Sequence, residues 1–368
     1  MSADASTPAQ ETTSQVVQHI FGEDNRLRLL NHYFGQSTAV EPSTAWQHVY
    51  RLLLWLDPTI GLAHCYESDK CRPGRPWYGR SLAFHAWLAD AFGVSAVELG
   101  SELDVLFRSA TDGIAAAAAG QRAASAEKAD RQRDPYKHWE MPLPGEDPEL
   151  VKLILDTIGE WLSKPPPPDT VLRDLTERIR AHVTQENKRK NLLGEGFEDT
   201  VAAILRRIPS ISEKYEIRVR PWLDHLPGFY SPRAGEKPRQ VDLALIRPPD
   251  DYRTLITCKW SVRSDREEQF ATDFEAYSRL ESAGQAFDYT FLTNEFDPAR
   301  LAAACTNRRG PNLLFKSVVH INPDGLRAAY NASVPRRGNG INRAIEQMES
   351  GRLASMEAWL QSLIQDAT

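Results

Sequence analysis

Asp242 and Lys259 lie in two neighbouring segments that alternate apolar and polar residues like half-buried strands. If these strands pair, the two side chains point into one pocket at the end of a sheet. Glu198 lies at the start of the preceding helical pattern, from which it could reach the same point. Converging carboxylates are costly unless a cation neutralises them, and oxygen ligands completed by water and phosphate suit Mg²⁺. A lysine beside them can orient a water and offset phosphate charge, which fits metal-assisted phosphodiester hydrolysis.

The segment CKWSVRSDREEQF (258–270) decides how this pair is interpreted, because an acid and a lysine on neighbouring strands usually form an ordinary ion pair. Arg263, Asp265 and Arg266 follow Lys259 by four, six and seven positions. Arginine is the best bidentate reader of guanine O6 and N7, and aspartate accepts from the cytosine amine. The cluster could therefore read a G·C tract. The alternative is an Arg/Asp network that caps the following helix.

This segment resembles the signature of the CCGG family of Type II restriction endonucleases, which have the PD-(D/E)XK fold. Relatives carry the same Arg, Asp and Arg after the lysine, a small hydroxyl residue and Cys before it, and Glu in a GxxFE-like upstream helix. The matching positions are Thr257, Cys258, Lys259, Arg263, Asp265, Arg266, Gly194, Phe197 and Glu198. The likeness covers roughly residues 185–325, and the long helical region before it is similar to a BsaWI-like architecture.

The resemblance implies Asp242 as the central metal ligand, Lys259 as the catalytic lysine and Glu198 as the helix-borne acid. The standard motif has an acid two positions before the lysine, whereas this chain has threonine there. The family instead takes a carboxylate, usually Glu, fourteen positions after the lysine, which is Asp273 here. Glu275, about 200° further around the helix, is the alternative. The implied ligands of Mg²⁺ are Asp242, Asp273 and the backbone carbonyl of Cys258.

For DNA, the resemblance assigns the two arginines of the cluster to the guanines of CCGG and its aspartate to the cytosines. Lys190 precedes the Glu198 helix and could hold a backbone phosphate, and Asn191 lies near where relatives place a polar base-contacting side chain. Residues 188–266 contain 16 Lys and Arg against 11 Asp and Glu, so this window is +5 and the remainder of the chain −11. A basic patch on an acidic chain suits a DNA cleft, although it serves solubility equally well.

The elements that must position these residues follow an α-β-β-β-α-β-α-β order, the core order of that fold with one further helix and strand. The expected helices are 194–208, 266–280 and 299–305, and the expected strands are 214–222, 239–246, 254–262, 289–294 and 317–323. The prediction is a mixed five-stranded sheet flanked by helices, which is the usual layered solution for such a pattern.

The chain before this region is helical in pattern and ends at KPPPPD (164–169), which forces an extended spacer. We expect residues 170–183 to form a connecting helix after this spacer. We expect residues 1–14 to be disordered, 15–165 to form a helical N-terminal domain and 170–368 to form the catalytic domain. The apolar spacing over 341–364 predicts a C-terminal helix. This helix could pack on its own domain or contact a second copy, because cutting a palindrome on both strands calls for two symmetric sites.

Length and composition exclude several classes of protein. With 368 residues, 41% of them hydrophobic and 26% charged, the chain has room for two cores and is not disordered throughout. Its four scattered cysteines suit a reducing cytoplasm better than a disulfide framework. It shows no secretory signal pattern, no apolar run of about 20 residues and no Walker-type phosphate loop.

Together these features predict a cytoplasmic, Mg²⁺-dependent Type II restriction endonuclease. The resemblance implies a homodimer or larger homo-oligomer that cleaves double-stranded DNA at a palindrome with a CCGG core. It also implies 5′ overhangs with 5′-phosphates, and a cognate methyltransferase in the same system. Two alternatives stay open: a repair or recombination nuclease of the same fold without CCGG specificity, and a DNA-binding module with a decayed nuclease core.

Overall fold

The computed structural model describes the following residues: 22–35, 39–54, 70–71, 74–75, 77–103, 148–159, 168–248, 250–263, 266–284, 286–331 and 339–366. The segment 1–14, expected to be disordered, lies outside them. The chain forms two compact units, one of residues 1–21 and 108–191 and one of residues 22–107 and 192–368. The second unit contains the sheet and the candidate site. No helix of the described part is long and apolar enough to cross a lipid bilayer.

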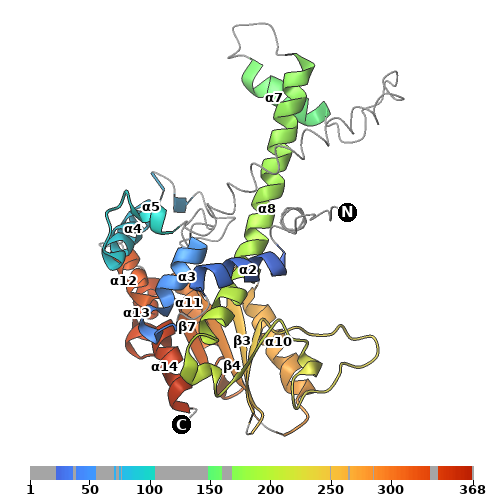
Figure 1. Cartoon of the computed structure of the whole chain (residues 1–368), viewed down its shortest axis with the longest axis vertical. Coiled ribbons are helices and arrows are strands. Elements are labelled where there is room, and N and C mark those ends of the chain that lie inside the picture. Colours follow the sequence, from blue (N-terminus) through green and yellow to red (C-terminus); the bar gives the residue numbers. More distant parts are fainter. Residues whose placement is uncertain are drawn as a thin grey trace, which may run out of the picture. The chain divides into compact units, whose positions relative to one another are not determined.

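A six-stranded mixed sheet forms the centre of the second unit (Figure 1). Its strands, in spatial order, are β1 (Glu216–Val219), β2 (Leu243–Arg247), β3 (Tyr252–Lys259), β4 (Asp288–Thr293), β7 (Ser317–His320) and β8 (Leu353–Ser355). The pairings β1–β2 and β2–β3 are antiparallel, and those from β3 to β8 are parallel. Two short strands, β5 (Arg308–Arg309) and β6 (Asn312–Leu313), form a separate antiparallel hairpin.

The central strands are buried on both faces. Along β2, successive residues Leu243 to Ile246 are at most 2% exposed although their side chains alternate between the two faces. Such a strand is covered on both sides, which is the usual condition of sheets flanked by helices. The expected mixed sheet flanked by helices is therefore confirmed, with six strands rather than the five expected.

Helices before and after the strands carry the residues of interest. The helix α8 runs without interruption from Asp169 to Leu205, whereas two separate helices were expected at 170–183 and 194–208. The intervening residues 184–193 include Gln, Glu, Lys and Arg and no proline, so nothing in them stops a helix. The helix α10 (Arg266–Leu280) follows β3 and has the bounds expected for it.

The described helices before residue 104 belong to the same unit as the sheet, so the units divide the chain differently from the expected domains. They are α2 (Glu23–Phe34), η1 (Pro42–Thr44), α3 (Ala45–Leu53), α4 (Tyr78–Phe92) and α5 (Leu99–Glu102). The hydroxyl of Tyr50 donates to Asn294 Oδ1 at 3.0 Å, and the rings of Phe84 and Phe296 meet edge to face with centroids 4.9 Å apart. These contacts tie α3 and α4 to the end of β4. The helix α7 (Pro148–Ile158) belongs to the other unit.

The prediction of one helix over 341–364 is wrong. The chain forms α13 (Asn339–Glu349), β8 and α14 (Met356–Asp366), because Gly351 adopts a left-handed φ of 71° and Leu353 then pairs with Val318 of β7. This adds the sixth strand. The apolar residues of this segment, expected either to pack on their own domain or to contact a second copy, are largely buried in their own unit, with Ile341 at 2% and Leu360 at 0% exposure.

Candidate functional site

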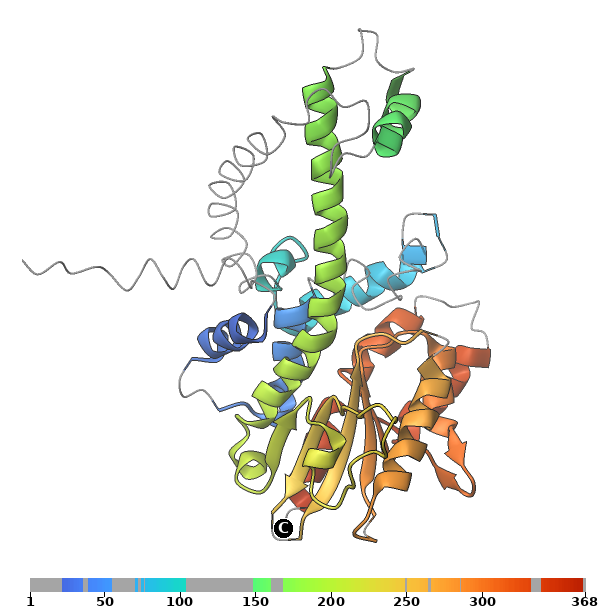
Figure 2. The same cartoon turned by 90° about the vertical axis from the view of Figure 1, so that its right-hand side faces the viewer.

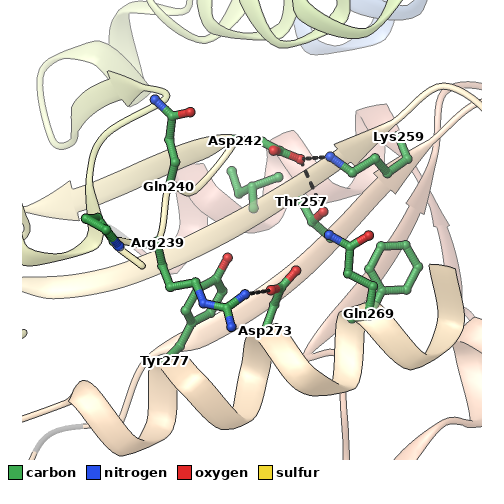
Figure 3. Close-up of a pocket in the computed structure, with 11 residues that line it drawn as sticks. Arg239, Gln240, Asp242, Thr257, Lys259, Gln269, Asp273 and Tyr277 are labelled. Carbon is green, nitrogen blue, oxygen red and sulfur yellow. Dashed lines mark hydrogen bonds and ion pairs between the residues drawn. The ribbon is translucent and has the colours of Figure 1, made fainter. Parts of the chain in front are cut away.

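A cavity of about 240 Å³ lies beside the ends of β2 and β3 (Figure 3). Three segments contribute polar side chains to it: the β1–β2 connection, β3 and α10. These side chains belong to Arg239, Gln240, Asp242, Thr257, Lys259, Gln269, Asp273 and Tyr277. The structure therefore brings together three of the four predicted catalytic residues, Asp242, Lys259 and Asp273, at one cavity.

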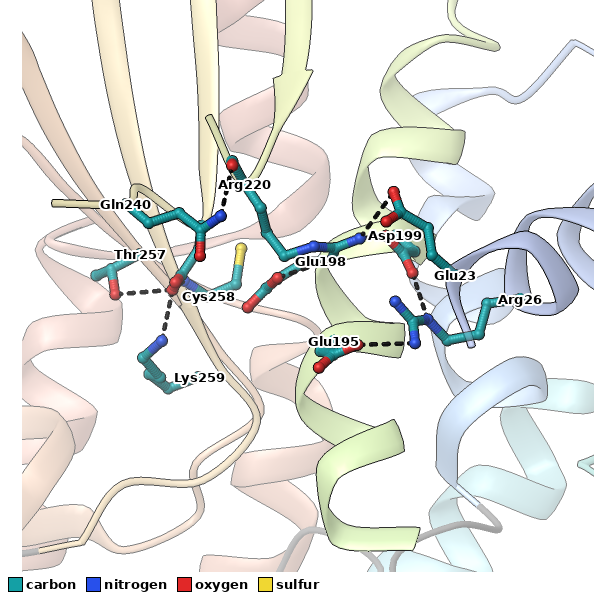
Figure 4. A network of polar contacts seen from close by, with 11 residues as sticks. Glu23, Arg26, Glu195, Glu198, Asp199, Arg220, Gln240, Thr257, Cys258 and Lys259 are labelled. Carbon is teal, nitrogen blue, oxygen red and sulfur yellow. Dashed lines mark hydrogen bonds and ion pairs between the residues drawn. The ribbon is translucent and has the colours of Figure 1, made fainter. Parts of the chain in front are cut away.

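Strand register places Asp242 and Lys259 together. Leu243 of β2 pairs with Ile256 of β3, so Asp242, directly before β2, lies next to Thr257, and Lys259 is two residues further along. Residues two apart on a strand share a face. Asp242 Oδ2 accepts from Lys259 Nζ at 2.6 Å (Figures 3 and 4) and from the backbone N–H of Cys258 at 2.8 Å.

The surroundings keep Lys259 charged. Burial favours the neutral amine, but the opposing charges of Asp242 and Glu198 outweigh it and raise the pKa of Lys259 above its ordinary value. The side chains of Lys259 and Asp242 remain 29% and 21% exposed, so both are accessible from the cavity. The pair therefore presents a fixed ammonium beside a carboxylate.

Asp273 reaches the same cavity from α10. Its Oδ1 accepts from Arg239 Nη1 at 3.0 Å (Figure 3). Burial and the nearby negative charge of Asp242 raise the pKa of Asp273, although the positive charges of Arg239 and Lys259 act to lower it. Gln269, Asp273 and Tyr277 are spaced by four residues, so they lie on one face of the helix.

Glu275, the alternative to Asp273, is absent from the cavity lining. Its side chain is 62% exposed and its Oε1 lies 3.2 Å from Arg309 Nη2. The two positions are about 200° apart around a helix, so when Asp273 faces the cavity, Glu275 cannot.

Glu198 approaches the group from α8 and is buried (Figure 4). Its Oε2 accepts from Arg220 Nη1 at 3.0 Å. Burial and the negative charge of Asp242 raise the pKa of Glu198 to about 7. Glu198 thus lies within electrostatic range of Asp242 and Lys259 but does not line the cavity.

Arg220 connects Glu198 to Asp242. Its backbone N–H donates to the carbonyl of Asp242 at 2.9 Å, and its own carbonyl accepts from Gln240 Nε2 at 2.8 Å. Its guanidinium also bonds Asp199 at 2.7 Å. The residue has a positive φ of 47°, which is uncommon without glycine, and these backbone bonds hold it there.

Most of the predicted DNA-contacting side chains fall outside what the structure describes. Arg263 is described and half-buried, next to Val262, whose N–H donates to Glu295 at 2.6 Å. Asp265 is not among the described residues, and Arg266 begins α10 with a side chain that is not described. The same holds for the side chains of Lys190 and Asn191 in α8. Base readout by this set stays a prediction.

The donor set of the cavity fits a hard cation that retains water. Within the described ranges, no three His, Cys, Asp or Glu side chains converge closely enough to form a protein-only metal site. Mg²⁺, however, is commonly held by one or two carboxylates, waters and substrate phosphate. Asp242 and Asp273 supply two such carboxylates. The carbonyl of Cys258 stays a predicted ligand; the amide of this residue bonds Asp242.

Several residues of the site were not predicted from the sequence. Arg239 and Gln240 stand three and two positions before Asp242, and Gln269 and Tyr277 flank Asp273 by four positions on either side. A search for polar residues at these spacings from the predicted acids would have found all four. Arg220 lies at no such spacing from a predicted acid, so this search would not have found it.

Comparisons of the chain with protein-family models, with curated proteins and with solved structures gave no match. Its function is therefore inferred from the side chains of the cavity and from the sequence motif.

Proposed function

We propose that the chain is a Mg²⁺-dependent PD-(D/E)XK endonuclease that cleaves double-stranded DNA at a palindrome with a CCGG core. The observation that carries this proposal is the 2.6 Å contact between Lys259 Nζ and Asp242 Oδ2, with Asp273 in the same cavity. The element order supports it as well, since α8, β1, β2, β3, α10 and β4 follow the α-β-β-β-α-β core of that fold.

Each side chain has a chemical task in this proposal. Asp242 and Asp273 would hold Mg²⁺, which when bound lowers the pKa of a water and polarises the phosphodiester. Lys259, held by Asp242, would offset the charge that builds on the phosphate during attack. Glu198, with a pKa near neutrality, would retain or release a proton at the edge of the site.

The proposed DNA specificity and the proposed assembly are based on the sequence motif. Arg263 and Arg266 would read guanines, and Asp265 would accept from cytosines. A homodimer or larger homo-oligomer would place two sites on the two strands and leave 5′ overhangs with 5′-phosphates. A cognate methyltransferase would protect the host DNA.

The first prediction concerns Lys259. In a plasmid digest with Mg²⁺, Lys259→Ala should cut at least about a hundredfold more slowly than the parent, because the phosphate charge is no longer offset. Lys316→Ala is the matched control, since this lysine is exposed and lies outside the cavity. Equal cutting by the parent and Lys259→Ala would remove the lysine from the mechanism.

Run-off sequencing of the cut ends separates the proposal from its rivals. A single recurring palindrome around CCGG supports the restriction enzyme. Random termini indicate a repair or recombination nuclease. No cutting with Mg²⁺, together with a gel shift on CCGG duplexes in Ca²⁺, indicates a DNA-binding module.

A further inference from the structure

Each of the two carboxylates in the cavity is paired with a cationic side chain. Lys259 holds Asp242, and Arg239 holds Asp273 through a 3.0 Å contact between Nη1 and Oδ1. The Arg239 side chain is 42% exposed and Asp273 is 18% exposed, so the carboxylate is the more enclosed partner.

Arg239 can leave Asp273 without releasing the chain that carries it. The β1–β2 connection is tied to α10 by a second ion pair, between Glu236 and Arg279 at 2.6 Å, which does not line the cavity. Backbone bonds from Tyr230 N to Leu280 O and from Ser282 N to Gly228 O, both 2.8 Å, fix the same connection. The Arg239 contact is therefore one tether among several.

We propose that Arg239 couples cation binding to phosphate binding at this cavity. A divalent cation and the guanidinium compete for the Asp273 carboxylate, since both are attracted by the same negative oxygens. Once the cation takes Asp273, the guanidinium is available for a DNA phosphate, which arginine binds in a bidentate manner. This inference rests on the proposed function, because it requires a cation and a phosphodiester at the same site.

Coupling of this kind is reciprocal. A phosphate that draws Arg239 away frees Asp273 and raises the affinity for the cation, and the cation raises the affinity for DNA by the same factor. A guanidinium at this position would therefore weaken cation binding in the absence of DNA.

The test measures Ca²⁺ binding to the full chain by calorimetry, without DNA. Arg239→Gln should bind Ca²⁺ about two- to fivefold more tightly than the parent, the range expected for losing a half-exposed ion pair. Arg279→Gln is the matched control: it removes the other ion pair to α10 and should leave Ca²⁺ affinity unchanged. Asp273→Asn should weaken Ca²⁺ binding. Equal affinities for the parent and Arg239→Gln, or the same gain in Arg279→Gln, would overturn the inference.

A second arm measures binding of a short CCGG duplex by fluorescence anisotropy, with Ca²⁺ and with a chelator. Ca²⁺ should strengthen duplex binding by the parent more than by Arg239→Gln, while Arg239→Lys should keep part of the effect. The same Ca²⁺ effect in the parent and in Arg239→Gln contradicts the coupling. Neither experiment measures cleavage. A protein that never cuts DNA would therefore contradict the proposed nuclease activity, while the calorimetry would still show whether Arg239 competes with the cation for Asp273.

Discussion

Glu198 and Asp242 are two carboxylates within electrostatic range of each other, and their surroundings differ. Asp242 receives an ammonium and a backbone N–H on one oxygen. Glu198 is more enclosed, and burial together with Asp242 raises its pKa to about 7 despite the contact with Arg220. A buried carboxyl whose pKa is raised in this way can hold a proton close to neutral pH.

This difference predicts a pH dependence of stability. The folded pKa of Glu198 is about 7, above its ordinary value of 4.5, so folding favours the protonated form. The stability of the parent relative to Glu198→Gln should be greatest below about pH 4.5 and should fall, by up to about 3 kcal/mol, as the pH rises to 7. Urea unfolding of both proteins across this window measures it. Glu295, whose pKa is also raised to about 7, is present in both and cancels. A pH-independent difference would contradict the prediction.

The helix α8 is held by arginines from two other segments (Figure 4). Arg26 of α2 contacts Glu195 at 2.7 Å and Asp199 at 2.6 Å, and Arg220 at the end of β1 contacts Asp199 at 2.7 Å. Asp199 is 1% exposed and Arg26 is 6% exposed, so the pair between them is shielded from water. The turn of α8 that carries Glu198 is thereby fixed against both neighbours.

Removing one partner of this buried pair should be costly. Arg26→Ala is expected to lower the free energy of unfolding by about 3 kcal/mol, because Asp199 stays buried with half of its compensation lost. Arg327→Ala removes an exposed pair with Asp324 and should cost no more than about 1 kcal/mol. Urea denaturation of both variants provides the comparison. Similar losses in the two would show that the α2–α8 contact is not specially stabilising.

The second unit has one core that includes the described helices before residue 104 as well as the sheet (Figures 1 and 2). Phe84 of α4 is fully buried and contacts Phe296, and it packs over Gly325 of α12 (Pro323–Asn331). A Cβ at Gly325 would lie 2.8 Å from a Phe84 ring carbon and 2.9 Å from Trp87. The close contact between α4 and α12 therefore requires glycine at this position.

Gly325→Ala should lower the free energy of unfolding by about 1–3 kcal/mol, since the added methyl group overpacks the contact with α4. Gly340→Ala is the control near the start of another helix, where the nearest atoms would lie at 3.8 Å. The free energy of unfolding of this variant should rise slightly, because alanine favours the helical conformation more than glycine does. Thermal unfolding followed by tryptophan fluorescence and by far-UV circular dichroism checks both variants. Equal stability of the two would contradict the proposed packing.

Local patterns predicted the elements that carry the site. The periodicity of 266–280 matches α10, and the alternation around 239–246 and 254–262 locates β2 and β3. The prediction of a single C-terminal helix was wrong because β8 has only three residues, too few to show a strand periodicity between its two flanking helices. The strand forms there because β7 offers it an edge to pair with.

Asp242 and Lys259 lie close together because two strands of recognisable periodicity are joined by a short connection. Their proximity could therefore be predicted from the local sequence alone. The choice of Asp273 over Glu275 depends on which face of α10 meets the cavity. The partners Arg239 and Arg220, and the merging of the early helices with the sheet, are set by contacts between residues far apart in the chain. Local periodicity holds no information about such contacts, because they arise only when separate elements pack together.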